Sequence, residues 1–393
     1  MKKTLVALAA LSAISAFAQS SVQITGYFDR GYTALSSTDG TASTKTLGSS
    51  AGTTRIEFRG TEDLGNGNNA GFFIESDWAD FGGATQTATV TQAQKAGFAN
   101  GENFLSLGNA NVGTLKLGAP NSFTLGNVTG VASPAFSTGV GSAYSVKFSI
   151  ANGVSTGADG YAGTAQNSST TTTAAIVGAR AIRINNTIQY VSPAFSGVTL
   201  GVNYTPQNNN VTAGTTAGNT VGVTEYALRY TNGPVDAMYT SAKYTAGSNG
   251  VYQSYLKFAA ASGAISGAQN VLTSSETSTQ NMLGLTYAVL PALKLHAGLG
   301  QFSSNDDTYK GKSQQFGATY TYGAWDIMGQ MAKVDDQSAT NFDRKITGLG
   351  ANYNLSKTTR VYARYEKVDY ATNQTAFAGS EVKRTALGMS KAF

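Results

Sequence analysis

The sequence predicts an all-β fold, a sixteen-stranded antiparallel transmembrane β-barrel, and three observations support this. Apolar and polar residues alternate with a period of two in many segments, each about ten residues long. The connections between these segments alternate between short turns and long stretches rich in Ser, Thr, Asn and Gly. The composition is low in charged residues (12%) and rich in glycine (46) and tyrosine (20). Strands of this kind close into barrels within a lipid bilayer.

The N-terminal segment has the features of a signal peptide. A pair of lysines is followed by the apolar stretch Leu5–Ile14 and then by the small-x-small cleavage site Ala16-Phe17-Ala18. The apolar stretch is too short to cross a bilayer core of ~30 Å as a helix. We therefore expect residues 1–18 to be cleaved on export and residues 19–393 to form a single barrel domain.

Strict alternation identifies the strands. In the segment 197–205, for example, Val198, Leu200 and Val202 alternate with polar or small residues, so one face of the strand is apolar and the other is not. The predicted strands are 22–34, 53–62, 69–79, 101–110, 113–119, 181–191, 197–205, 221–231, 234–245, 279–289, 292–302, 313–322, 324–334, 344–355, 358–370 and 382–393.

The ends of the strands carry aromatic residues on the apolar face, as in the aromatic belts at membrane interfaces. The members of this set are Trp78, Tyr190, Tyr204, Tyr230, Tyr287, Tyr322, Trp325, Tyr353 and Phe393. The long connections are all predicted at the opposite end of the barrel from the short turns. The longest of them, 120–179, contains only two charged residues, Lys147 and Asp159.

Several function classes are disfavoured. The absence of cysteine excludes disulfide scaffolds, zinc-thiolate sites, iron–sulfur clusters and thiol catalysis. His296 is the only histidine, and no nucleophile motif accompanies it. The acidic pairs at 62–63, 306–307 and 335–336 lack the spacing of a calcium loop. Lys and Arg are scattered rather than clustered, which disfavours nucleic acid. We expect no enzyme activity, no cofactor and no bound metal.

Specific motifs add a family resemblance. The stretch Gly60–Gly67, GTEDLGNG, resembles the strand–turn motif of the general porins of β-proteobacteria, the Neisseria and Burkholderia type. The segments 21–29 and 183–197 resemble the first strand of that family and its strand after the constriction loop. The chain also ends in Phe393, as outer-membrane barrels usually do, and the resemblance implies that this residue is an assembly signal for the barrel-assembly machinery.

The resemblance implies a homotrimer in the outer membrane of a Gram-negative bacterium, surrounded by outer-membrane lipid. Such porins passively conduct small hydrophilic solutes and inorganic ions. Their third external loop folds into the barrel and narrows the pore, and by position that loop lies within 120–179. The chain departs from the family at Ala119, where an arginine usually follows glycine, and in the unusual length and low acidity of this loop.

Strand parity identifies the side chains that face the lumen, because arginine or lysine on the lipid face costs ~2–4 kcal/mol at the midplane. The predicted basic residues of the lumen are Arg55, Arg59, Lys116, Arg183, Arg229, Arg360 and Arg364. The predicted acidic residues are Glu57, Glu75, Asp77, Glu225 and Glu366. The surplus of cations favours a weak anion preference. Alternatively, pairs such as Arg55 with Glu75 cancel one another.

Two other functions are compatible with a β-rich exported chain. An extracellular adhesin would explain the strands and polar loops, but not the alternation of short and long connections. An outer-membrane hydrolase barrel would need catalytic groups that the sequence does not show. We therefore expect a diffusion porin and keep an adhesin or other non-porin barrel as the alternative.

Overall fold

The computed structural model describes residues 21–38, 43–78, 98–99, 101–142, 186–206, 222–245, 252–253, 271–272, 277–304, 310–337, 343–370 and 381–393. Several sequence predictions lie outside these residues. They include the signal peptide 1–18, the part of the long connection from 143 to 179, the start of the predicted strand 181–191 with the predicted lumen residue Arg183, and the acidic pair at 306–307.

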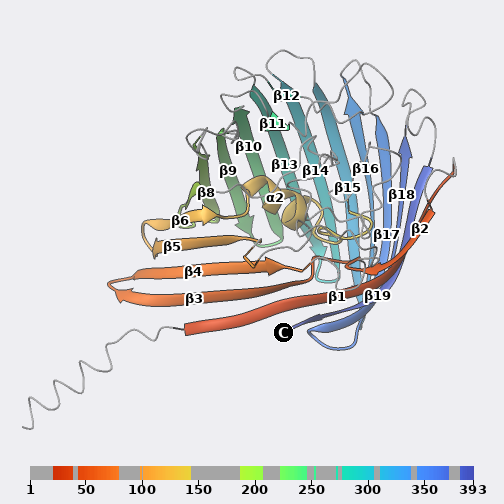
Figure 1. The fold of residues 1–393 in the computed structure, drawn as a ribbon, viewed down its shortest axis with the longest axis horizontal. Helices are drawn as coiled ribbons and strands as arrows, with labels where there is room; N and C mark the ends of the chain where they lie inside the picture. The colour runs from red at the N-terminus through yellow and green to blue at the C-terminus, as the bar shows by residue number, and fades with distance from the viewer. Residues whose placement is uncertain are drawn as a thin grey trace, which may run out of the picture.

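In the described part of the chain, sixteen strands run antiparallel around a closed barrel (Figure 1). Each strand pairs with the next, and the last strand pairs back onto the first to close the sheet. The strands are β1 (Ser21–Ser37), β3 (Arg55–Gly65), β4 (Asn68–Asp77), β5 (Asn103–Asn109), β6 (Gly113–Ala119), β7 (Thr187–Val191), β8 (Val198–Thr205), β9 (Gly222–Asn232), β10 (Val235–Thr245), β13 (Thr277–Leu290), β14 (Leu293–Ser304), β15 (Lys310–Tyr322), β16 (Trp325–Asp336), β17 (Arg344–Asn354), β18 (Thr359–Tyr370) and β19 (Glu381–Ala392).

The sixteen-stranded antiparallel barrel predicted from the alternation is therefore confirmed. The outer face carries large exposed apolar side chains, such as Leu283, Leu299 and Phe316 on three successive strands. Side chains of the other parity face the interior, where they are polar or pack against chain inside the barrel. This division follows from the pleat, which sends successive side chains to opposite faces.

Three short strands were not predicted. β2 (Ser43–Gly48) pairs with the far end of β1, in the connection between the predicted strands 22–34 and 53–62. β11 (Tyr252–Gln253) and β12 (Val271–Leu272) form a separate two-stranded sheet. These segments are mainly Ser, Thr and Gly or very short, so they carry no apolar alternation that would reveal them.

A segment that follows β6 lies inside the barrel (Figure 1). It begins with the helical turn α2 (Phe123–Gly126), whose N-cap Ser122 accepts a hydrogen bond from the backbone N–H of Leu125. It continues as the π-helical turn η2 (Asn127–Ala132). Val131 of this turn is fully buried against Ala227 and Met238 of the wall. Among the described residues, no helix is long and apolar enough to cross a membrane.

Candidate functional site

The inner segment 122–142, which we call the inner loop, follows the barrel wall from β9 to β18. Its polar atoms bond directly to inward-facing groups of the strands, so it is fixed against this side of the barrel. These bonds are Asn127 Nδ2 to the Met238 carbonyl (2.9 Å), Thr286 Oγ1 to the Val131 carbonyl (2.7 Å), the Gln315 side-chain amide to the Ala132 carbonyl, and the hydroxyl of Ser133 to Gln330 Oε1 (2.7 Å).

Glu225 anchors the start of the inner loop. Its fully buried carboxylate accepts hydrogen bonds from the backbone N–H groups of Phe123 (3.0 Å) and Thr124 (2.6 Å). The hydroxyl of Thr124 (2.6 Å) and Nδ2 of Asn203 (3.1 Å) donate to it as well. The carboxylate thus satisfies backbone donors that would otherwise be buried without partners.

Glu366 anchors the other end of the inner loop. Its carboxylate accepts the backbone N–H of Gly141 (2.9 Å) and pairs with the guanidinium of Arg384 at 2.6 Å. Both partners of this ion pair are almost completely buried. Gly348 makes the close approach possible, because a Cβ at this position would collide with the carbonyl oxygen of Gly141. Glu225 and Glu366 lie on the inner face of the barrel, and the inner loop covers them.

A second part of the barrel wall is formed by β3 to β6. In the described part of the chain, residues 123–141 form hydrogen bonds with one another, with the adjoining Ser122 and Ser142, with the strands from β9 to β18 and with Ser50. None of these bonds reaches β3 to β6. We call this the open wall. Arg55, Arg59 and Lys116 extend from it, together with the carboxylates of Glu57 and Glu75.

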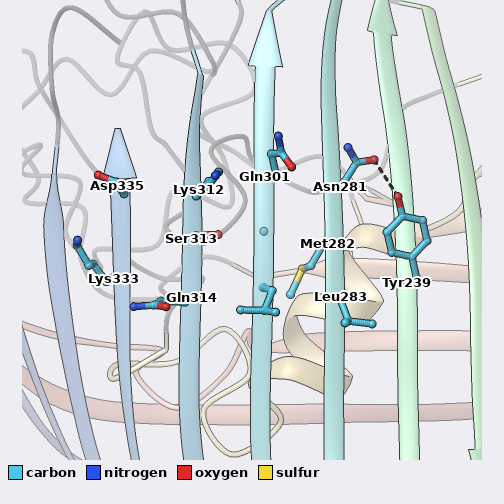
Figure 2. Close-up of a pocket in the computed structure, with 12 residues that line it drawn as sticks. Tyr239, Asn281, Met282, Leu283, Gln301, Lys312, Ser313, Gln314, Lys333 and Asp335 are labelled. Atoms are coloured by element: carbon cyan, nitrogen blue, oxygen red, sulfur yellow. Dashed lines mark hydrogen bonds between the residues drawn. The ribbon is translucent and has the colours of Figure 1, made fainter. Parts of the chain in front are cut away.

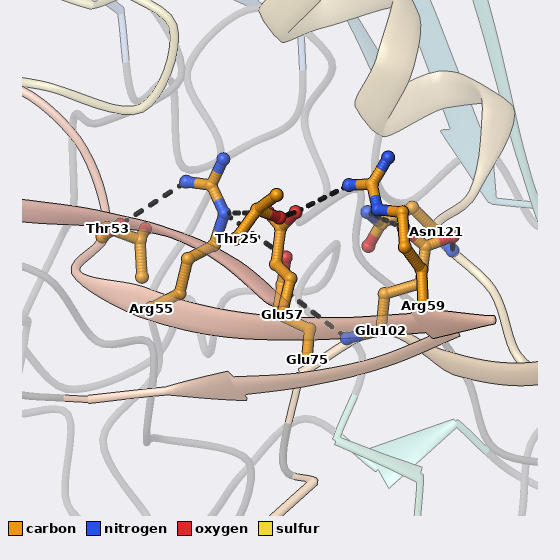
Figure 3. Close-up of polar contacts among 8 residues, drawn as sticks. All are labelled: Thr25, Thr53, Arg55, Glu57, Arg59, Glu75, Glu102 and Asn121. Atoms are coloured by element: carbon orange, nitrogen blue, oxygen red, sulfur yellow. Dashed lines mark hydrogen bonds and ion pairs between the residues drawn. The ribbon is translucent and has the colours of Figure 1, made fainter. Parts of the chain in front are cut away.

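The carboxylates of the open wall lie beneath its arginines. Glu57 bonds to Nε of Arg55 (2.6 Å) and to an Nη of Arg59 (2.7 Å), and Figure 3 shows both arginines on the same side of the sheet. Glu75 lies 3.3 Å from Arg55. The side chains of Arg55 and Arg59 are 34% and 47% exposed, whereas those of Glu57 and Glu75 are 11% and 10% exposed. The positive groups are therefore the ones that a solute meets first.

The remaining predicted residues occupy different environments. Asp77 stands opposite Arg55 in the β3–β4 register. Arg229 is held by Asp236 through two hydrogen bonds of 2.9 and 2.7 Å near a short turn, so its charge is neutralised. Arg360 donates to Ser390 (3.1 Å) and to the Tyr27 hydroxyl (3.0 Å).

Arg364 is buried rather than open to the lumen. Its guanidinium donates to the carbonyl of Ala351 (3.1 Å) and to Oδ1 of Asn352 (2.6 Å). Phe136 of the inner loop lies over it, with the ring centroid 5.9 Å from the guanidinium carbon. Like Glu366, this residue lies below the inner loop.

Sequence reasoning missed Asp29, which is fully buried on the inner face of β1. Its Oδ2 accepts the backbone N–H groups of Ser50 (2.6 Å), Ala51 (2.7 Å) and Gly52 (3.1 Å), and its Oδ1 accepts the hydroxyl of Tyr362 (2.6 Å). The carbonyl of Ser50 in turn accepts the N–H of Val140 at 2.7 Å. The inward parity of Asp29 was the available signal.

The single histidine has a structural environment. His296 lies between the hydroxyls of Thr286 (2.9 Å) and Thr319 (3.1 Å) on the inner wall. Within the described residues, no group of three or more His, Asp or Glu side chains is arranged to hold a metal ion.

Comparison with known proteins decides the family. The sequence profile described as Gram-negative porin matches residues 4–373. The chain belongs to this family. Outer membrane porin protein 32 of Delftia acidovorans is 30% identical over 375 residues, which span 92% of this chain and 88% of that relative. An outer membrane porin protein of Bordetella pertussis is 28% identical over 227 residues, 53% of this chain and 57% of that protein.

Solved porin structures share the fold of this chain. The anion-selective porin from Comamonas acidovorans is 25% identical, with a TM-score of 0.67 over 95% of this chain and all of that one. A loop-deletion mutant of OmpT from Vibrio cholerae, 12% identical with a TM-score of 0.62 over 95% of this chain and 99% of that one, shares the fold. The porin is thus a channel protein of the outer membrane, and the resemblance to β-proteobacterial porins is confirmed. The adhesin alternative finds no support in these relatives.

The outer face of the porin changes from apolar to polar near the long loops. A groove of about 490 Å³ follows this boundary across β10 and β13 to β16 (Figure 2). Leu283 and Leu299 line its apolar part, and Lys312 and Lys333 line its polar part. Lys333 stands directly opposite Lys345 in the β16–β17 register, and in the described chain neither ammonium forms an ion pair.

The C-terminal residue of the porin lies at the barrel seam. The backbone N–H and carbonyl of Phe393 exchange hydrogen bonds of 3.1 and 3.0 Å with Gly26 of β1. A Cβ on Gly26 would lie 2.5 Å from the Phe393 ring. The terminal side chain therefore packs on the strand to which β19 must pair to close the barrel.

Proposed function

We propose that the porin conducts small hydrophilic solutes and inorganic ions with a preference for anions, and that the connection 120–179 narrows its lumen. The observation that carries this proposal is the layering of charge on the open wall. Arg55 and Arg59 project beyond the less exposed Glu57 and Glu75. Coulomb interaction falls with distance, so a passing ion interacts more strongly with the nearer positive groups.

The inner loop strengthens this imbalance. Two of the five predicted lumen acids, Glu225 and Glu366, are covered by the loop and bonded to it. They are therefore removed from the surface that solutes contact. Lys116 remains on the open wall, and in the described chain no carboxylate lies within ion-pair distance of it. The relative from Comamonas acidovorans is an anion-selective porin, which supports the same preference here.

We further propose a homotrimer embedded in outer-membrane lipid. A Vibrio cholerae structure of the same fold is described as a trimer form. The exposed apolar band supports contact with lipid chains, and Lys312, Lys333 and Lys345 support contact with headgroups above it. The packing of Phe393 on Gly26 supports a role of this residue in barrel assembly by the assembly machinery. We expect no catalytic activity.

The selectivity proposal is tested by replacing Arg55 and Arg59 with glutamine. An ion about 7 Å from one guanidinium in water interacts with it by about 0.6 kcal/mol, and 0.1 M salt roughly halves this. Removing both charges shifts the energies of anion and cation in opposite directions by about 0.6 kcal/mol each. The anion-to-cation permeability ratio should then fall by about five- to tenfold.

The measurement is the zero-current potential across a planar bilayer with a salt gradient at about 0.1 M. The matched control replaces Lys333 and Lys345 with glutamine, which removes two positive charges from the outer face. The control should keep the wild-type ratio. An unchanged ratio in the arginine variant would refute the assignment of these two residues to the selectivity of the pore.

A further inference from the structure

The open wall carries a row of two aromatic rings between two cations, and ion conduction alone does not need the rings. Arg59, Phe73 and Phe104 are directly opposite one another in the registers of β3, β4 and β5. The Arg59 guanidinium lies over the Phe73 ring, 5.2 Å from its centroid. The two rings stack with centroids 5.7 Å apart and planes inclined by 21°. The ammonium of Lys116 on β6 lies over the Phe104 ring at 4.4 Å.

The four side chains thus form one continuous row, which we call the aromatic ledge: cation, ring, ring, cation. Their side chains face the interior of the barrel, because the adjacent residues Phe72, Leu105 and Leu117 belong to the outer face. A water-filled lumen is expected to be polar, so two half-buried phenyl rings side by side on its wall are unusual.

The order of the strands determines which parts of the rings can meet a solute. Phe73 lies between Arg59 and Phe104, and Phe104 lies between Phe73 and Lys116. The faces of both rings are therefore occupied by these neighbours. The ring edges remain, and the edge of a phenyl ring carries partial positive charge. The ledge is therefore apolar along its rings and has a cation at each end.

The two cations remain available to a ligand. Arg59 shares Glu57 with Arg55, and nearly half of its side chain is exposed. Within the described residues, Lys116 forms no ion pair and no hydrogen bond, and its ammonium contacts the Phe104 ring. A carboxylate or sulfonate can bond to either cation without first displacing a buried partner.

We propose that the aromatic ledge is a binding site for small organic anions that carry an aromatic ring, and that the porin favours their passage. The anionic group pairs with Arg59 or Lys116. The negative face of the ligand ring lies across the positive edges of Phe73 and Phe104, in the edge-to-face arrangement that aromatic pairs prefer. This inference rests on the proposed anion-conducting function and names one class of its solutes.

The test uses three probes that separate charge from ring. Benzoate carries both, cyclohexanecarboxylate has the charge and a saturated ring, and benzyl alcohol has the aromatic ring without the charge. Each is titrated into single wild-type channels that conduct chloride in a planar bilayer. Benzoate should reduce the chloride current at concentrations about two- to tenfold lower than cyclohexanecarboxylate, as expected for one additional aromatic contact. Benzyl alcohol should have no effect at those concentrations.

Variants then assign the effect to the ledge. Phe73→Leu and Phe104→Leu keep the wall apolar and remove the ring edges, so the advantage of benzoate should disappear while chloride conduction remains. Phe72→Leu is the matched control, since it removes a ring from the outer face of the same strand. It should keep the advantage of benzoate.

The outcomes distinguish this inference from the function on which it rests. An anion-selective channel in which benzoate and cyclohexanecarboxylate reduce the current equally would overturn the ledge and leave the proposed function intact. The wild-type probe series decides this even if a leucine variant fails to fold. A wild-type channel that prefers cations would overturn both.

Discussion

Replacing Glu225 with alanine should release the start of the inner loop from the barrel wall. Glu225 accepts two backbone hydrogen bonds and one hydroxyl hydrogen bond from Phe123 and Thr124 of the loop, at 2.6 to 3.0 Å. In the variant these donors face a buried space without an acceptor. The rest of the barrel stays intact, because none of the strand ladders uses this side chain.

The size of the effect follows from these three bonds. Hydrogen bonds to a charged group contribute about 1.5–3 kcal/mol each, so the sum is about 4.5–9 kcal/mol. In the variant, water from the lumen can bond to some of these donors and so recover part of the lost energy. We therefore take about 3 kcal/mol as the lower bound on the loss of docking free energy. That value lowers the ratio of docked to undocked loop by about 150-fold. The loop should then fluctuate in the channel.

The assay is single-channel recording at increasing voltage. Glu225→Ala should show greater open-channel noise and should switch to lower conductance at smaller voltages than the wild type. Glu225→Gln, which keeps the shape and one acceptor oxygen, should lie between the two. Heat resistance of the barrel on gels controls for folding. Noise and switching voltage identical to the wild type in a folded alanine variant would refute the anchoring role of Glu225.

Three further predictions concern other parts of the molecule. Gly348→Val should push the end of the inner loop into the lumen, since a Cβ collides with Gly141, and should lower single-channel conductance; unchanged conductance would contradict this. Deletion of Phe393 should reduce the yield of assembled barrel in the outer membrane, measured by heat-modifiable gel mobility, and wild-type yield would count against the seam role. The double variant Lys333→Gln, Lys345→Gln should retain less anionic lipid than the wild type after detergent extraction, as measured by native mass spectrometry. Equal retention in variant and wild type would contradict the proposed contact of these lysines with lipid headgroups.

Strand parity could be predicted from the sequence because it depends only on the nearest neighbours along the chain. The alternation in β14 or β18 identifies the face of each residue without knowledge of the fold. The pairing of Arg229 with Asp236 was also within reach. Both side chains face the interior of the barrel, and the two residues lie on adjacent strands joined by a short turn. The pairing of these strands therefore brings the two side chains close together.

The roles of Glu225, Glu366 and Asp29 could not be predicted in this way. Parity predicts that these carboxylates face inward, but their function depends on which distant backbone N–H groups lie above them. Gly141 lies 225 residues from Glu366 in the sequence. Nothing local in a polar, glycine-rich segment specifies that approach. Parity alone therefore cannot identify which acidic side chains the inner loop covers.

The most direct test of anion preference is the zero-current potential of the wild-type porin in a planar bilayer across a tenfold gradient of potassium chloride. The layering of Arg55 and Arg59 over Glu57 and Glu75 predicts that chloride crosses more readily than potassium. The dilute side should then become negative. A positive potential on the dilute side would mean that the carboxylates control the channel and would contradict the proposed selectivity.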